Sequence, residues 1–201
     1  SLLYFSDRLL SADRPEEAVD VLKKVIRFDR NSKIAYRKLA QAYSEIDDLE
    51  NASIVYENLL KLDPRDLHII VQTSKLYIEL QNFRKALLWA DKAIQVSKSS
   101  GQGFGQKGNV YYKAFQSCRS TDITNDDRIV ASLAYKYFQL AEENNYTHYS
   151  GSAAWLKENE TLFSRANWFM IDPDKQSKGY LLPETACYNW VEERLKKDPT
   201  W

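Results

Sequence analysis

Residues 36–64 read YRKLAQAYSEIDDLENASIVYENLLKLDP, and this stretch carries the strongest structural signal in the chain. Within it, Tyr36, Leu39 and Tyr43 follow the i, i+3, i+7 spacing that places side chains on one face of a helix. After a turn at residues 47–48, a second stripe of this kind consists of Ala52, Tyr56, Leu59 and Leu60. Proline cannot continue a helix and restrains the residue before it, so Asp63-Pro64 ends the second helix. The stretch therefore predicts two helices joined by a tight turn.

The same pattern recurs with a period of 34 residues on both sides of this stretch. The equivalents of Ala52, Tyr56 and Leu59 are Ala18, Leu22 and Val25 upstream, and Ala86, Ala90 and Ala93 downstream. Small residues at such positions allow two helices to cross closely. The turns repeat as well, because Asp13…Glu16 and Asp47…Glu50 both have the spacing of a helix-capping box. A fixed period of this length is typical of an array of helical hairpins.

The second repeat resembles the tetratricopeptide repeat family, and the residues that carry this resemblance are Tyr36, Leu39, Ala40, Tyr43, Ala52, Tyr56 and Pro64. The resemblance covers roughly residues 1–145 and implies an all-α solenoid of helical hairpins that winds into a right-handed superhelix. It predicts four repeats, at about residues 1–32, 33–66, 67–100 and 101–145.

The fourth repeat contains an insertion. By the period its first small residue belongs at position 120, but the matching alanine is Ala134, so about 14 residues are inserted. The segment CRSTDITN at 118–125 is the predicted loop. At the other end, the first repeat begins nearly in phase with residue 1, and Leu2–Phe5 are poor capping residues. We therefore expect the chain to be part of a longer array.

Residues 146–201 break the period, and we expect them to cap the last repeat. Helices are predicted over residues 150–165 and 183–197, with a loop over 167–180. The last helix would carry an apolar stripe of Cys187, Trp190, Val191 and Leu195. This segment is rich in aromatic residues, which either cover the last repeat or form an exposed binding surface. In the second case, the surface includes Trp168, Trp190 and Trp201.

The composition is typical of a soluble globular protein, with 44% hydrophobic and 28% charged residues in 201. Equal numbers of basic and acidic residues, 28 each, disfavour bulk electrostatic binding to nucleic acid or anionic lipid. The chain contains no run of 18 apolar residues, so the sequence predicts no transmembrane helix. Cys118 and Cys187 can pair with each other, stay buried as thiols or be exposed. The sequence therefore does not distinguish a cytoplasmic protein from a periplasmic or extracellular one.

No pattern of catalytic or metal-binding residues is recognisable, so we predict no enzyme activity, cofactor or metal. His68 and His148 are the only histidines, and no HExxH motif or Cys/His cluster is present. The sequence GQGFG at 101–105 lacks the GK[ST] ending of a phosphate-binding loop, so we interpret it as a linker turn. Cys118 adjoins Arg119 but has no histidine partner that would activate it as a nucleophile.

The family resemblance implies where a partner binds. In such proteins the first helix of each repeat lines a concave groove. The matching positions here include Arg37, Lys38, Gln41, Gln72, Lys75, Ile78, Gln106, Asn109 and Tyr112. Co-chaperone members of the family clamp a terminal carboxylate with several basic side chains. The corresponding positions of this chain hold one cation, Arg37, so we predict that it is not a clamp for chaperone tails.

We therefore expect a non-enzymatic scaffold or adaptor that binds a segment of another protein in this groove. The expectation excludes nucleic acid as a partner and direct insertion into a membrane. Two alternatives remain. In the first, copies of the chain self-assemble through Leu2–Phe5 or through the helix that carries Trp190. In the second, the C-terminal aromatic residues bind a glycan or another small ligand.

Overall fold

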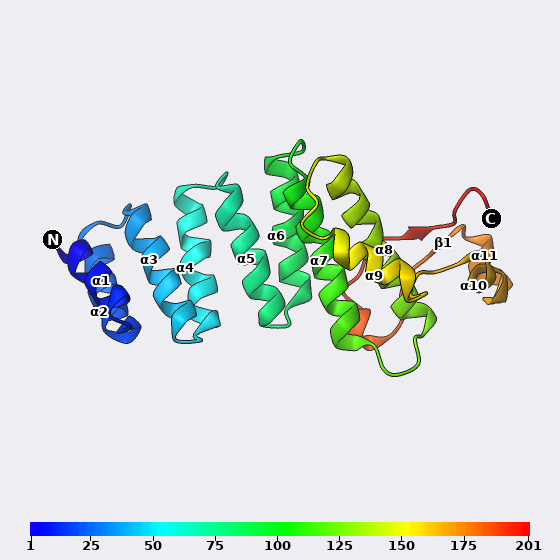
Figure 1. Ribbon diagram of the computed structural model, residues 1–201, viewed down its shortest axis with the longest axis horizontal. Helices are drawn as coiled ribbons and strands as arrows, with labels where there is room; N and C mark the ends of the chain where they lie inside the picture. Colours follow the sequence, from blue (N-terminus) through cyan, green and yellow to red (C-terminus); the bar gives the residue numbers. More distant parts are fainter. The chain divides into compact units, whose positions relative to one another are not determined.

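The computed structural model describes residues 1–201, and these form two compact bodies, Ser1–Asn82 and Phe83–Trp201 (Figure 1). The N-terminal body contains α1 (Leu2–Ser11), α2 (Pro15–Phe28), α3 (Lys33–Glu45), α4 (Leu49–Leu62) and α5 (Leu67–Glu79). The C-terminal body begins with α6 (Phe83–Val96), α7 (Gly101–Cys118) and α8 (Asn125–Glu143). The predicted all-α architecture of successive helical hairpins is confirmed. No helix combines the length and the apolar character that crossing a membrane requires.

Alanines at the helix crossings form the centre of the N-terminal body. Ala18, Ala40 and Ala52 are fully buried, as their repeated positions predict. Around them pack larger apolar side chains of the predicted stripes, among them Leu22, Leu39, Tyr43 and Val55. Because a methyl group is all that fits where two backbones approach closely, the repeated small residues allow the helices to pack along their length.

The turn that follows α1, α3 and α5 has the same backbone form every 34 residues. Asp13, Asp47 and Gln81 have positive φ angles of 56°, 60° and 55°. The next amide in each case donates to a carbonyl five residues earlier: Arg14 to Leu9, Asp48 to Tyr43 and Asn82 to Tyr77. This left-handed residue ends the first helix of the hairpin. The prediction that Asp13 and Asp47 cap the second helices is therefore wrong. The cap of α4 is Asp48, whose Oδ1 accepts the amide of Asn51 at 3.2 Å.

Part of the insertion is the loop at residues 119–124 between α7 and α8, close to the predicted loop, and the rest lengthens α7 and α8 to 18 and 19 residues. A capping box ends the loop: the Thr124 hydroxyl accepts the amide of Asp127 at 3.2 Å, and the Asp127 carboxylate accepts the amide of Thr124 at 2.9 Å. These reciprocal bonds satisfy amides that a helix start leaves open. They fix the first turn of α8.

The C-terminal segment contains three short helices and a small sheet. They are α9 (Ser150–Glu158), α10 (Arg165–Met170), α11 (Pro173–Ser177), β1 (Tyr180–Leu181), the 3₁₀ turn η1 (Ala186–Tyr188) and β2 (Leu195–Lys196). β1 and β2 pair antiparallel, with Tyr180 opposite Lys196. The predicted helix over 183–197 is therefore wrong. The predicted helix over 150–165 ends at Glu158, and the predicted loop over 167–180 contains α11 and most of α10.

Candidate functional site

Most of the predicted groove positions of the N-terminal body lie on α3 and α5, and we call the side of α1, α3 and α5 that carries such positions the inner face. Intramolecular ion pairs occupy part of it. Lys38 on α3 pairs with Asp7 on α1, and Arg37 on α3 pairs with Asp66 at the start of α5. Gln41 donates to Glu45 at 2.8 Å on the same helix. The two ion pairs hold neighbouring first helices together.

Both carboxylate oxygens of Asp66, the partner of Arg37, accept hydrogen bonds. Its Oδ1 accepts the amide of Ile69 at 3.1 Å and so caps α5, while its other oxygen accepts from Arg37. Burial alone would raise the pKa of Asp66, but these two hydrogen bonds and the charge of Arg37 lower it. The carboxylate therefore stays ionised and connects the Arg37 side chain to the next repeat.

The predicted groove residues on α5, unlike those on α3, have no polar partner within the chain. Gln72 and Lys75 are half-buried, and neither side chain makes a hydrogen bond or ion pair within the chain. Ile78, one turn further, is half-buried as well. The three side chains follow the i, i+3, i+6 spacing of one helix face. They form a short stripe whose polar groups are available to a partner.

In the C-terminal body, the corresponding face of α7 is covered. Gln106 is only 1% exposed, and it accepts a hydrogen bond from Tyr149 at 3.4 Å. Tyr112 packs edge-on against Trp155 of α9, with ring centroids 6.3 Å apart. The predicted role of Gln106 as a groove contact is contradicted, because the segment that follows α8 lies over it. Asn109, between these two positions, is half-buried.

Gly105 explains how this segment approaches so closely. A Cβ atom at this position would lie 2.9 Å from the ring of Tyr146 and 3.0 Å from the ring of Tyr149. Such distances are shorter than contacts between carbon atoms allow, so only glycine accommodates both rings in this arrangement. The interpretation of GQGFG as a linker turn is therefore wrong: these residues form the first turn of α7, and their glycines allow close packing.

A second part of the C-terminal segment, residues 184–193, docks on α6, α7 and α8. Trp190 stacks on Phe83 of α6 and on Tyr111 of α7, with centroid distances of 5.8 and 5.9 Å. The indole nitrogen of Trp190 donates to the carbonyl of Cys187 at 3.0 Å. This arrangement buries a large aromatic side chain and satisfies its polar atom.

Glu193 fixes the end of this docked segment. Its carboxylate accepts hydrogen bonds from Tyr137 at 2.8 Å, Lys136 at 2.8 Å and Tyr111 at 3.2 Å, and it lies 3.1 Å from Lys107. Burial by itself would raise the pKa of Glu193, but the contacts with Lys136, Lys107 and Tyr137 outweigh it and lower the pKa. Burial and the Glu193 charge together raise the pKa of Tyr137 to about 12. The network therefore favours an ionised Glu193 and neutral tyrosines.

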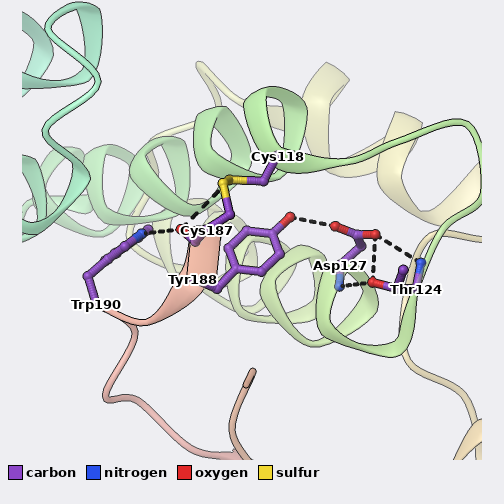
Figure 2. The surroundings of a disulfide bond; sticks show 6 residues. All are labelled: Cys118, Thr124, Asp127, Cys187, Tyr188 and Trp190. Carbon is purple, nitrogen blue, oxygen red and sulfur yellow. Dashed lines mark hydrogen bonds between the residues drawn. A yellow bond between two sulfur atoms is a disulfide. The ribbon is translucent and has the colours of Figure 1, made fainter. Parts of the chain in front are cut away.

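A disulfide joins Cys118, at the end of α7, to Cys187 in the docked segment (Figure 2). The structure thereby selects pairing among the three states that the sequence left open. Next to the bond, Tyr188 donates to the Asp127 carboxylate at 2.6 Å. The carboxylate of Asp126 accepts the amides of Glu184 and Thr185 at 2.8 and 2.7 Å. The start of α8 therefore holds the segment by both side chains and backbone.

These contacts correct the prediction of an exposed aromatic surface. Trp168 is 2% and Trp190 is 7% exposed, so neither ring is open to a ligand. Trp201 is half-buried and packs 6.1 Å from Trp168 and 6.4 Å from Phe163, between ring centroids. It also lines an open pocket of about 400 Å³. Of the three tryptophans, only Trp201 stays partly accessible.

Comparison with known proteins agrees with this architecture. The tetratricopeptide repeat family model matches residues 35–66. MamA from Desulfovibrio magneticus RS-1 superposes with a TM-score of 0.61 at 17% identity, over 79% of this chain and 83% of that one. YrrB, a TPR protein with an unusual peptide-binding site, gives a TM-score of 0.55 at 15% identity, over 79% and 76% of the two chains.

PilF from Pseudomonas aeruginosa gives a TM-score of 0.56 at 19% identity and covers 89% of this chain and 74% of that chain. At such identities the likeness concerns the fold. It agrees with the 34-residue period, the repeated left-handed turns and the family match in the second repeat. The chain therefore has the fold of tetratricopeptide-repeat proteins, and one repeat, residues 35–66, matches the family's sequence model.

Proposed function

We propose that this chain is a non-enzymatic scaffold that binds a segment of a partner protein on the inner face of its N-terminal body. The observation that supports this most is the state of α5, where Gln72 and Lys75 are half-buried and have no partner within the chain. Partly buried polar groups lose hydrogen bonds to water, so a partner that supplies hydrogen bonds restores them. An acceptor such as a backbone carbonyl or a carboxylate suits both side chains.

The binding surface we propose is smaller than the groove that the sequence predicts. Arg37 and Lys38 have ion-pair partners within the chain, and Gln106 lies beneath Tyr149. We therefore assign to Arg37 and Lys38 the role of holding α1, α3 and α5 in register. Direct contact is assigned to Gln72, Lys75 and Ile78.

The mechanism is geometric. Helices that are already ordered present their contacts without a folding step, so this chain loses little backbone entropy on binding. Ile78 supplies apolar area, and Lys75 supplies a cation that a carboxylate or carbonyl of the partner can approach. YrrB, with its unusual peptide-binding site, is a precedent for peptide recognition on this fold.

The test is a pull-down from the lysate of the source organism with three baits: the natural chain, Gln72→Glu/Lys75→Glu, and Lys113→Glu/Gln116→Glu. The third variant is a matched control, because it makes the same two changes three residues apart on the exposed side of α7. We expect a specific protein that is lost from the α5 variant and retained by the α7 control. Equal retention on all three baits would contradict the assigned site.

A second candidate function is self-association, and one observation favours it. Leu2, Tyr4 and Phe5 on α1 are exposed large apolar side chains within one helical turn and a half. Adjacent exposed apolar residues of this kind are common at contacts between chains. Sedimentation velocity over a range of concentrations tests this candidate. A mass that rises with concentration, and that Tyr4→Ser/Phe5→Ser returns to the monomer, would support it.

A further inference from the structure

The junction between the first two hairpins concentrates positive charge in a chain whose total charge is zero. Residues 23–34, which run from the last turns of α2 into α3, contain five cations and the single carboxylate of Asp29. The local net charge is therefore +4. We call residues 23–34 the basic tip.

Three of the five cations in the basic tip have no partner. Lys23 lies over the ring of Tyr43, and Lys33 pairs with Asp63 at 2.9 Å. Lys24, Arg27 and Arg30 are exposed and make no ion pair or hydrogen bond through their side chains. The Asp29 carboxylate accepts the amide of Asn31 at 3.0 Å and forms no ion pair. Nothing within the chain neutralises the three remaining cations.

The basic tip also contains two exposed large apolar side chains. Phe28 is 85% exposed and Ile34 is 59% exposed. Lys24 and Phe28 are neighbours on one face of α2 because they are four residues apart, and Arg27 adjoins Phe28. On α2, Phe28 therefore has unpaired cations as its neighbours.

Packing within the repeat array does not account for Phe28. The residues at the same repeat position, 34 and 68 residues later, are Leu62 and Val96, and both are half-buried. A cation near a helix end is explained by the helix dipole, and Arg27 fits that explanation. The dipole does not explain why the largest apolar residue at this position is the one left in solvent.

We propose that the basic tip docks on the surface of a membrane that contains anionic lipids. Phe28 and Ile34 enter the interfacial region, and Lys24, Arg27 and Arg30 lie beside lipid phosphates. Apolar side chains that protrude between cations suit a deformable interface in which phosphates lie above acyl chains. Anchors of protein interfaces, in contrast, usually fill matched pockets. The proposed contact is peripheral. It differs from the expectation that a chain of zero net charge does not bind anionic lipid.

The test is flotation of the full chain with phosphatidylcholine vesicles and with vesicles that also contain phosphatidylglycerol. The variants are Arg27→Glu/Arg30→Glu, Phe28→Ser and the charge-matched control Lys113→Glu/Lys157→Glu, whose two lysines are exposed and unpaired. Circular dichroism checks that each variant is folded. This proposal is independent of the partner groove, and its outcome leaves the groove untouched.

We expect binding to the anionic vesicles that weakens by about tenfold or more in both tip variants and persists in the control. Binding should also fall as salt rises from about 0.1 M to 1 M, because screening shortens the range of the attraction. Three results would overturn the proposal: no binding to anionic vesicles, equal loss in the Lys113/Lys157 control, or no effect of Phe28→Ser. The last result would mean that the tip attracts polyanions in general, an acidic protein among them, without entering a lipid interface.

Discussion

The hydroxyl of Tyr188 lies 2.6 Å from Oδ1 of Asp127, across 61 residues of sequence. The second oxygen of the same carboxylate accepts the amide and the hydroxyl of Thr124, at 2.9 and 2.7 Å. One carboxylate therefore caps α8 and also holds the C-terminal segment against it (Figure 2). Because one carboxylate makes both contacts, the position of the C-terminal segment depends on the first turn of α8.

Replacing Tyr188 with phenylalanine should destabilise the C-terminal body. The change keeps the ring but leaves Oδ1 of Asp127 buried without its donor, which costs about 1–3 kcal/mol. The midpoint of chemical unfolding measures the loss. Tyr4→Phe is the control, because the Tyr4 hydroxyl is exposed and its loss should shift the free energy of unfolding by less than about 0.5 kcal/mol. An equal effect of the two substitutions would contradict the role of Asp127.

Reducing the Cys118–Cys187 disulfide should weaken the same body. The bond closes a loop across a sequence separation of 69 residues. For a loop of this length, chain entropy in the unfolded state predicts a loss of about 4 kcal/mol. The same value is expected for Cys118→Ser/Cys187→Ser, measured by denaturant unfolding without reductant. A bond of this kind also predicts an oxidising compartment, so thiol labelling of the protein from its source should find both cysteines blocked. Free thiols in freshly isolated protein would contradict that prediction.

Acid should loosen the docked segment, because it removes the charge of Glu193. The pKa of Glu193 is lower in the folded chain than its ordinary value of 4.5. Its contribution to stability is therefore fully present above pH 4.5 and is lost as the pH falls through the lowered pKa. Fluorescence of the tryptophans, four of which lie in residues 146–201, reports the loosening. Glu193→Gln should reduce the pH dependence below pH 4.5, and an unchanged acid transition in this variant would contradict the role of Glu193.

Adding one methyl group at Gly105 should disturb the cover over α7. Gly105→Ala forces the new Cβ against the rings of Tyr146 and Tyr149, and overpacking of this kind costs about 1–3 kcal/mol. Gly151→Ala is the matched control, since a Cβ there meets no atom within 4 Å. In α9 that change should be neutral or stabilise by up to about 1 kcal/mol. Thermal unfolding of both variants measures the difference, and a neutral Gly105→Ala would show that the cover is loosely packed.

The helical hairpins follow from the sequence because their contacts are local and repeated. Ala18, Ala40 and Ala52 mark helix crossings, and their burial follows from the period alone. Which aspartate of the Asp47-Asp48 turn caps the next helix is harder to predict. Asp47 has the spacing of a cap, but the left-handed turn needs one more residue, and the cap moves to Asp48.

The C-terminal segment was predicted wrongly because its contacts lie far away in the sequence. Cys187, Trp190 and Leu195 have a spacing that resembles a helix stripe. In the structure, Cys187 bonds to Cys118, and Trp190 stacks between Phe83 and Tyr111. These distant partners hold the backbone in an irregular path that no local pattern reveals. For the same reason, a polar Gln106 suggested an open groove although Tyr149 covers it.

We propose that a partner binds on α5 of the N-terminal body, while the corresponding face of α7 is covered. Hydrogen exchange of the chain, free and with the captured partner, tests this claim most directly. We predict slower exchange upon binding in peptides from residues 67–79, with no change at 101–118. Protection confined to residues 101–118 and 150–158 would contradict the account and would place the binding surface on the C-terminal body.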